Sequence, residues 1–271
     1  MNTPGDSPLA PERVAARLRS PGCWRLSGGG VTGSTNDDAR ALAVAGEPGG
    51  AAVLATVQTA GRGRFDRVWE SPGGGVYLSA LLRPDLDPAQ AGFLALAAGI
   101  SVVRALDRLD AALGPALGLK WPNDVLADGG KLAGILVESS ARAGAIDWVV
   151  VGVGVNVARS PDAPAGGRAF LSDLTGPESL ALKPDRVAAA VLDELADRLG
   201  RVPRDGDALC DLISEYEELS GDVGREVTVR DRAGAVLAEG RVAGFDGSGR
   251  MLVETPAGVV AVASGESTLR T

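Results

Sequence analysis

The sequence predicts an α/β or α+β layer architecture for residues 1–222 and a small β module for residues 223–271. In the first part, apolar runs of strand length alternate with helical patterns. From Gly224 onward, short strand patterns are separated by Ala-Gly, Asp-Gly and Pro-Ala-Gly turn signals. The second part alone has little core, so we expect it to pack against the larger domain.

The first expected elements lie between residues 10 and 46. Residues 10–19 form a short amphipathic pattern, with Pro11 where helices tolerate it. The run GGGVTGSTNDDARALAVAG predicts a glycine-rich loop that enters a helix. Ser34 or Thr35 is the expected N-cap of that helix, and Gly46 is expected to end it.

The remaining strands and helices of the larger domain follow in order. The run WVVVGVGVNV, residues 148–157, is apolar almost throughout and predicts a central strand covered on both faces. The other expected strands are Ala51–Thr56, Val76–Leu82, Leu117–Trp121 and Lys131–Val137. The other expected helices are Asp87–Leu113, Pro184–Leu199 and Asp205–Leu219.

Composition and charge exclude several classes of function. The chain has 27 Lys and Arg against 35 Asp and Glu, and the net charge of −8 disfavours general nucleic-acid binding. It has no histidine, which excludes His-based acid–base catalysis, Ser-His-Asp triads and most zinc sites. Cys23 and Cys210 lack metal-ligand spacing and favour a reducing compartment. Because no signal peptide and no membrane-spanning apolar run are present, we expect a cytoplasmic protein.

The segment Gln58–Trp69, QTAGRGRFDRVW, is the strongest functional signal in the chain. It sets Arg62, Arg64 and Arg67 among glycines in an otherwise acidic protein. Glycine lets the backbone approach a ligand closely, and guanidinium groups bind phosphate or carboxylate with a planar fork. The segment lies between two expected strands and predicts a phosphate-handling loop, with a flexible, solvated turn as the alternative.

Three other motifs carry candidate polar groups. In KWPND, Pro122 favours an extended residue before it, and Asn123-Asp124 begin a turn. Lys131 opens an apolar strand and either presents a fixed positive charge to an anion or extends its ammonium to water. The triplet Ser34–Asn36 either caps a helix or offers donors and acceptors to a urea or amide group. The VGVGVN run lacks the third glycine of a dinucleotide fingerprint, so its glycines indicate close approach of a ligand or a neighbouring backbone.

Taken in order, the motifs GSTN, QTAGRGR, KWPND, GGKLAGILVE and GVGVN, between Gly33 and Asn156, resemble those of the biotin protein ligases. The C-terminal β module also ends in GESTLR, much as that of the family does. The resemblance implies a catalytic domain over residues 1–222. Its mixed sheet with flanking helices would be related to class II aminoacyl-tRNA synthetases and lipoate ligases. It further implies that residues 223–271 form a domain similar to an SH3 barrel.

The resemblance implies roles for individual residues. GSTN and the glutamine before the Arg/Gly loop would bind biotin, and the loop would fold over biotin and the adenylate phosphate. KWPND would line the adenylate site, and Asn156 would lie near the nucleotide. The implied catalytic residues are Arg64, Lys131 and Asp124. No residue is assigned to a metal, and the implied ligand-binding residues are Ser34, Thr35, Asn36, Gln58, Gly61, Arg62, Gly63, Arg64, Arg67, Trp69, Asn123, Lys131, Gly134, Gly154 and Asn156.

Two features depart from the family pattern. The family usually continues GRGR with a basic or polar residue followed by Gly-Arg, whereas this chain continues with Phe65-Asp66-Arg67. We expect Asp66 to loosen the closed loop or to pair with Arg64 or Arg67. Many relatives carry an N-terminal helix-turn-helix, and the stretch before Gly33 is too short for one, so DNA binding is not expected.

The resemblance implies an ATP-dependent, AMP-forming ligase that works in two steps. Biotin is first activated as biotinyl-5′-AMP, with Mg²⁺ and the cations Arg62, Arg64 and Lys131 neutralising charge. The biotinyl group then passes to a lysine of a biotin carboxyl carrier domain of an acyl-CoA carboxylase. Asp124 is the expected proton acceptor or orienting group for the lysine amine, since no histidine is present. The protein is expected to be a monomer or a homodimer. A lipoate or octanoate ligase of the same fold and a non-catalytic biotin sensor are the alternatives.

Overall fold

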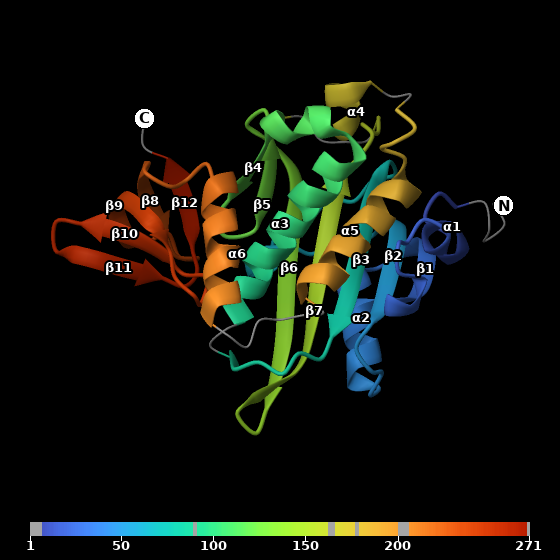
Figure 1. The fold of residues 1–271 in the computed structure, drawn as a ribbon, viewed down its shortest axis with the longest axis horizontal. Helices are drawn as coiled ribbons and strands as arrows, with labels where there is room; N and C mark the ends of the chain where they lie inside the picture. The colour runs from blue at the N-terminus through green and yellow to red at the C-terminus, as the bar shows by residue number, and fades with distance from the viewer. Residues whose placement is uncertain (1–6, 89–90, 162–165, 177–178, 200–205, 270–271) are drawn as a thin grey trace.

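The computed structural model describes residues 7–88, 91–161, 166–176, 179–199 and 206–269 (Figure 1). The first part of the chain builds a mixed sheet whose strand order is β1-β2-β3-β7-β6-β5-β4. The strands of this sheet are β1 (Arg25–Thr32), β2 (Ala51–Gln58), β3 (Gly75–Leu82), β4 (Leu117–Lys120), β5 (Asp124–Ala127), β6 (Gly130–Arg142) and β7 (Ala145–Asn156).

The sheet is mixed because β1 and β2 pair in parallel while the other neighbours pair antiparallel. Strand β7 stands in the middle of the order, and residues 149–156 within it are all buried. This agrees with the expectation from its unbroken apolar run, because a strand that is covered on both faces exposes neither face to water and carries apolar residues on both.

Helices α3 (Ala91–Leu109) and α5 (Pro184–Leu199) lie across one face of the sheet (Figure 1). Successive strand residues point to opposite faces. In β7, the core beneath these helices therefore contains Val149, Val151 and the alternate residues that follow them. Helix α2 (Thr35–Val44) packs on the opposite face, where it contributes to a smaller apolar cluster with Val150. Every second position of β7 therefore remains available to the α2 side of the sheet.

The C-terminal strands form a five-stranded antiparallel sheet, ordered β11-β10-β9-β8-β12. Helix α6 (Gly206–Leu219) lies between the two sheets (Figure 1), and its Tyr216 ring meets Phe245 edge-on at 4.8 Å between centroids. The predicted fold class, with a small β module packed on the larger domain, is confirmed. The strands of the small sheet are β8 (Glu226–Arg230), β9 (Val236–Phe245), β10 (Met251–Thr255), β11 (Gly258–Val262) and β12 (Glu266–Leu269).

One prediction near the N-terminus was wrong. Residues Arg25–Thr32 form strand β1, whereas the glycine-rich sequence indicated a loop because glycine is rare in strands. The strand is irregular at its glycines, with a register shift against β2 between Gly28 and Gly30. Gly28 has φ +82°, and a Cβ there would lie 2.4 Å from the carbonyl oxygen of Leu54. The glycines thus allow a distorted strand to pass close to its neighbour.

Other differences concern boundaries and short elements. The helix expected over Asp87–Leu113 ends at Leu109, and a 3-10 turn over Ala111–Ala116 that contains Pro115 follows it. Strand β5 was not predicted, because its four residues directly follow a turn. The expected N-terminal helix is limited to α1 (Pro11–Ala15), a short helix α4 (Leu171–Thr175) was not expected, and Asp205 lies outside the described residues. Among the described helices, none is long and apolar enough to cross a membrane.

Candidate active site

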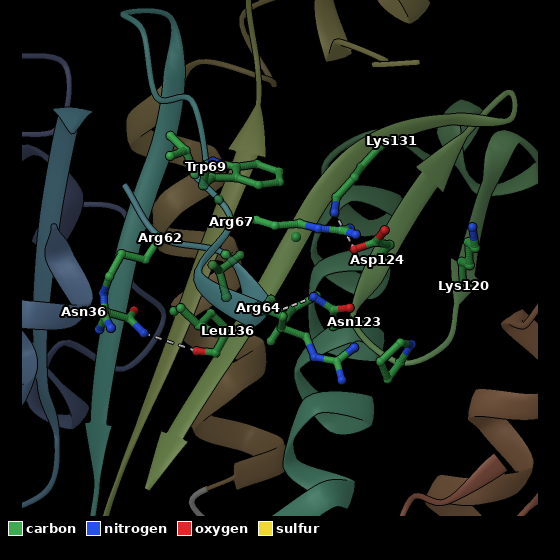
Figure 2. A pocket seen from close by; sticks show the side chains of 18 of the residues that line it. Asn36, Arg62, Arg64, Arg67, Trp69, Lys120, Asn123, Asp124, Lys131 and Leu136 are labelled. Atoms are coloured by element: carbon green, nitrogen blue, oxygen red, sulfur yellow. Dashed lines mark hydrogen bonds and ion pairs between the residues drawn. The ribbon is translucent and has the colours of Figure 1, made fainter. Parts of the chain in front are cut away.

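A pocket of about 300 Å³ opens over the large sheet on the face opposite α3 and α5, a size typical of small-molecule sites (Figure 2). Strands β5, β6 and β7, the N-terminus of α2, the Arg/Gly loop and strand β12 of the small sheet all contribute to its wall. All of the predicted site residues line it except Gly61 and Asn156. The pocket residues are Ser34, Thr35, Asn36, Gln58, Arg62, Gly63, Arg64, Arg67, Val68, Trp69, Lys120, Trp121, Pro122, Asn123, Asp124, Lys131, Gly134, Ile135, Leu136, Gly152, Val153, Gly154, Gly265, Glu266, Ser267 and Thr268.

The side chain of Asn36 spans one transverse row of the sheet. In the strand registers, Ser79 of β3 lies beside Gly152 of β7, which lies beside Leu136 of β6. A Cβ on Gly152 would lie only 2.0 Å from Asn36 Oδ1, so glycine makes room for the amide. Asn36 Oδ1 accepts a hydrogen bond from Ser79 Oγ at 2.6 Å, and Nδ2 donates to the Leu136 carbonyl at 3.4 Å (Figure 2). The two neighbours fix which way the amide points.

The indole of Trp69 lies over the next row of the same face. Gly154 of β7 pairs with Gly134 of β6, and a Cβ on either glycine would lie within 2.8 Å of the indole. Lys131 Nζ is 5.2 Å from the centre of a Trp69 ring, a cation–π distance. Trp69 Nε1 is buried and has no hydrogen-bond partner in the described part of the chain. A ligand acceptor at this point would remove the cost of that unpaired donor.

Gln58 joins the start of α2 to the strand that enters the Arg/Gly loop. Its Oε1 accepts from the backbone nitrogen of Thr35 at 2.9 Å and from Thr35 Oγ1 at 3.1 Å. Its Nε2 donates to Ser71 Oγ at 2.8 Å. Ser34 occupies the predicted N-cap position, but its side chain makes no capping hydrogen bond. Gln58 supplies the acceptor instead, which leaves the Ser34 side chain on the pocket wall.

The Arg/Gly loop connects β2 to β3 and folds back on itself. Trp69 N donates to Gly61 O at 3.0 Å and Gly63 N donates to Arg67 O at 2.7 Å, so the two halves of the loop pair with each other. Gly61 lies outside the pocket but sits against this turn, and a Cβ there would be 2.3 Å from the Trp69 carbonyl oxygen. At the tip, Phe65 and Asp66 have φ of +57° and +61°, a region that glycine occupies more easily.

The three loop arginines have different partners. Arg62 Nη2 lies 2.5 Å from Glu138 Oε2 and 3.0 Å from Asp37 Oδ1. Arg67 forms an ion pair with Glu266 of the small sheet. Arg64 Nη1 donates to the carbonyl of Gly265 at 3.3 Å. Figure 2 shows Arg62 beside Asn36 at one end of the pocket and Arg64 beside Asn123. The loop therefore brings Arg64, rather than Arg62, to the KWPND side.

Asp66 at the tip of the loop and Arg64 beside the pocket have different surroundings. Asp66 pairs with neither Arg64 nor Arg67, because its carboxylate bonds Arg232 of the small sheet at 2.6 Å. The tip points away from the pocket at this residue, which places the two partners first expected out of reach. Burial lowers the pKa of Arg64, although the carboxylates of Asp124 and Glu266 partly offset this. Arginine remains charged near neutral pH, so a desolvated Arg64 gains more from a bound anion than a solvated one would.

Lys131 and Asp124 face each other at the other end of the pocket (Figure 2). Lys131 Nζ lies 2.6 Å from Asp124 Oδ1. Asn123 Nδ2 donates to the carbonyl of Ile135 at 2.9 Å, which ties the KWPND turn to β6. Asn156 lies outside the pocket and is buried, and its Nδ2 donates to the carbonyl of Lys131 at 3.1 Å. Its contact is with the backbone that carries Lys131.

The small sheet fixes the KWPND turn through Trp121. The buried indole Nε1 donates to the carbonyl of Gly249 at 3.1 Å, and the backbone nitrogen donates to Asp222 Oδ2 at 2.7 Å. The carbonyl of Trp121 accepts from Ser267 Oγ at 3.3 Å. Three separate points of the C-terminal region therefore hold one residue of the motif. The C-terminal module is a structural part of the pocket wall.

Sequence reasoning missed several residues of this site. Glu138, Ser79 and Asp37 contact predicted site residues, and residues 265–268 of the small sheet line the pocket. The GGKLAGILVE motif already contained Glu138, and alternation along β6 places it on the face of Gly134 and Leu136. The contribution of Ser79 and residues 265–268 depends on strand register and on domain packing, which no local pattern contains.

The described residues contain no group of three or more Asp, Glu, Cys or His side chains that could hold a metal ion. Two carboxylates, Asp124 and Glu266, line the pocket, and each is paired with a cation. Such a site suits a cation whose ligands are mainly phosphates and water, as those of Mg²⁺ commonly are. It does not suit a cation whose ligands all come from the protein.

Comparisons with known proteins agree with this geometry. Residues 28–156 match the family described as "Biotin/lipoate A/B protein ligase family", and residues 222–269 match "Biotin protein ligase C terminal domain". The chain is 39% identical over 236 residues to a biotin–[acetyl-CoA-carboxylase] ligase of Paracoccus denitrificans, covering 84% of this chain and 93% of that one. It is 37% identical over 240 residues to the ligase of that name from Mycobacterium tuberculosis, covering 87% and 85%. Among solved structures, it resembles biotin protein ligase from Aquifex aeolicus in complex with biotin and ATP, with a TM-score of 0.73, 29% identity and 91% and 98% coverage.

Proposed function

The chain belongs to the biotin protein ligase family, and from that premise we propose that it joins biotin to a lysine of a biotin carboxyl carrier protein at the expense of ATP. One observation carries the proposal. Motifs that are scattered along the sequence between Gly33 and Asn156 meet around one pocket, together with strand β12 of the C-terminal module. The pocket has one end lined by hydroxyl and amide groups, where the charge of Arg62 is neutralised by Glu138 and Asp37. This neutral polar end and the cationic end at Arg64 and Lys131 match a ligand with a urea ring at one side and a carboxylate at the other.

We place the biotin rings at the neutral end, near Ser34, Thr35, Asn36 and Gln58. The amide and hydroxyl groups there offer both donors and acceptors, which a urea group requires. Trp69 and the glycines beneath it supply an apolar wall, and the indole N–H has no partner among the residues that the structure describes. This arrangement supports the residue roles that the sequence predicted for the GSTN triplet and Gln58.

The adenylate belongs at the cationic end, between Arg64, Lys131 and the KWPND turn. In the first half-reaction, a biotin carboxylate oxygen forms a bond to the α-phosphorus of ATP, and the bond from that phosphorus to the bridging oxygen of pyrophosphate breaks. Lys131 and Arg64 stabilise the approach of two anions, and stabilisation of this kind is strongest in a desolvated site. Mg²⁺ would be held through the ATP phosphates, with Asp124 as the carboxylate available to its water shell, and it would supply further charge neutralisation.

In the second half-reaction, the ε-amine of a carrier lysine forms an amide bond with the biotinyl carbonyl carbon. The bond from that carbon to the AMP oxygen breaks, and AMP leaves. The amine must lose one proton, and we assign Asp124 as the acceptor because it faces Lys131, whereas Glu266, the other carboxylate of the pocket, is held by Arg67. The Arg/Gly loop, held over the pocket by the small sheet, would keep the reactive anhydride from water meanwhile.

Mass spectrometry of a carrier domain tests this function directly. Incubation with the protein, biotin and MgATP is expected to add one biotinyl group per carrier domain. Parallel reactions with lipoic or octanoic acid in place of biotin are expected to leave the carrier mass unchanged. A mass gain with lipoic or octanoic acid alone would favour the related lipoate or octanoate ligases, and no gain with any acid, although biotin binds, would favour a non-catalytic sensor.

We propose that the catalytic unit comprises residues 1–222, that an SH3-like unit comprises residues 223–271, and that the protein acts in the cytoplasm. We further propose that it does not bind DNA and that it acts as a monomer or a homodimer. A gel-shift measurement at physiological salt and light scattering of the full chain would test the last two points.

A further inference from the structure

We propose that Glu138 is a positioning residue for biotin binding, which holds the first arginine of the loop and the last residue of the GSTN motif in one hydrogen-bonded unit. This inference rests on the proposed function. Glu138 Oε2 accepts from Arg62 Nη2 at 2.5 Å and from Asn36 Nδ2 at 2.8 Å. A single carboxylate oxygen therefore joins β6, the Arg/Gly loop and helix α2.

The strand register explains why Glu138 reaches this point. Gly134, Leu136 and Glu138 alternate along β6 and face the α2 side of the sheet. Glu138 pairs across the ladder with Val150, one pleat beyond the row of Gly152 on which Asn36 rests. Glu138 does not line the pocket itself, but it contacts Asn36 and Arg62, which do.

Asn36 links Glu138 to the rest of the neutral end of the pocket. Asn36 Oδ1 accepts from Ser79 Oγ, which is fully buried and lies 2.8 Å from Thr35 Oγ1. The backbone nitrogen of Thr35 donates to Gln58 Oε1 at 2.9 Å, so the single proton of the Thr35 hydroxyl is available to Ser79 Oγ as well as to Gln58. A continuous polar chain thus runs from Glu138 to Gln58. In such a chain each member fixes the orientation of the next. Displacement of Glu138 would therefore change the orientation of the side chains along the pocket wall.

The contacts of Arg62 show that the pair with Glu138 orients this side chain. Its Nη2 is shared between Glu138 and Asp37, while its Nε is buried and has no hydrogen-bond partner among the described residues. Asp37 is the more exposed carboxylate and also pairs with Arg40. Glu138 is the more buried partner, with 24% of its side chain exposed, so it is the stronger anchor.

Calorimetric titration with biotin in the absence of ATP tests this role. Loss of a charged hydrogen bond at a half-buried site is expected to weaken biotin binding about 10-fold to 100-fold in Glu138→Ala. Glu138→Gln keeps an acceptor for Asn36 but loses the charge that holds Arg62, so a smaller loss of at least about 3-fold is expected. Glu254→Gln, an exposed glutamate on strand β10, is the matched control and should bind biotin as the wild type does.

Two further measurements separate positioning from general stability. The KM for ATP should change by less than about 3-fold in Glu138→Gln, because the anchor acts at the biotin end of the pocket. In a double-mutant cycle, Arg62→Ala together with Glu138→Ala should bind biotin no more weakly than the weaker single variant. If Glu138→Ala fails to fold, Glu138→Gln alone decides the matter. Equal biotin affinity in wild type and Glu138→Gln, or equal losses for biotin and ATP, would overturn the proposal. A wild-type protein that does not bind biotin would overturn the proposed function as well.

Discussion

Lys131 Nζ lies 2.6 Å from Asp124 Oδ1, so the two residues expected to serve the two half-reactions form an ion pair. Lys131 is expected to meet the biotin carboxylate and the phosphate, and Asp124 to meet the incoming amine. In the pair, each side chain already holds a group of opposite charge, as it is expected to do when a substrate anion approaches Lys131 and an amine approaches Asp124. When biotin and ATP bind, the Lys131 ammonium would pair with their anionic groups. Asp124 would then be free to meet the lysine amine in the second step.

The first prediction concerns Lys131. Lys131→Ala should lower the rate of adenylate formation at least about 100-fold, as removal of a preorganised charge partner does elsewhere. Pyrophosphate release with biotin and MgATP in the absence of carrier measures this step alone. Asp124→Asn keeps a side-chain oxygen for the water shell of Mg²⁺, so it should retain most of that release but lose transfer from preformed biotinyl-AMP to the carrier. Pyrophosphate release at the wild-type rate in Lys131→Ala would rule out the assignment.

The second prediction concerns retention of the intermediate. Arg64 is partly desolvated and touches the carbonyl of Gly265, so it connects the loop to the small sheet across the cationic end. Arg64→Ala should weaken that contact as well as the attraction for phosphate, and biotinyl-AMP should dissociate about 10-fold or more faster. Filter separation of labelled adenylate from the enzyme over time provides the rate. Release at the wild-type rate would argue against a lid function.

The third prediction concerns Asp66, which departs from the family pattern. Asp66 has φ +61°, and its ion pair with Arg232 joins two side chains that are 83% and 65% exposed. Such a surface pair contributes about 0–1 kcal/mol, and a left-handed backbone costs a non-glycine residue about 1 kcal/mol. Asp66→Gly should therefore change the free energy of unfolding by less than about 1 kcal/mol and leave biotinylation equal or faster.

Arg232→Ala is the control for that variant, since it removes the same ion pair without altering the loop backbone. If the pair itself holds the loop, both variants should lose activity together. If only Asp66→Gly slows biotinylation strongly, the left-handed aspartate has a role in the loop that the pair does not explain.

The sequence predicted the parts of the site that are local, and it missed those that depend on assembly. The Arg/Gly loop, KWPND and Lys131 could be recognised because their chemistry lies in consecutive residues. Asn36 could be named, but not the glycine that gives it room, since Gly152 becomes its neighbour only through the register of β3 with β7. The three bonds to Trp121 depend on how the small sheet packs. The same reasoning explains the misread β1, whose glycines suggested a loop because the partner strand that accommodates them is distant in sequence.

The last prediction concerns the pH dependence of stability at the domain junction. Burial raises the pKa of Asp222, although the hydrogen bond from the Trp121 backbone and the charges of Lys120 and Arg225 oppose the shift. A carboxyl group whose folded-state pKa lies above its unfolded value contributes stability that is full below the unfolded value of about 3.9 and is lost as the pH rises through the folded value. Asp222→Asn removes this dependence and keeps an acceptor for Trp121.

The stability of Asp222→Asn relative to wild type should therefore increase as the pH rises from about 4 through the folded pKa of Asp222, as measured by urea unfolding at a series of pH values. Asp246→Asn should behave in the opposite way. Burial alone would raise the pKa of Asp246, but hydrogen bonds from Arg250 and Ser248 lower it, so this carboxylate stabilises the fold above the acid range. Its removal should therefore cost more stability as the pH rises from acid to neutral. The relative stability of Asp222→Asn could instead stay constant or fall with rising pH while Asp246→Asn responds as expected. That result would show that the neighbours of Asp222 cancel the effect of burial on its pKa.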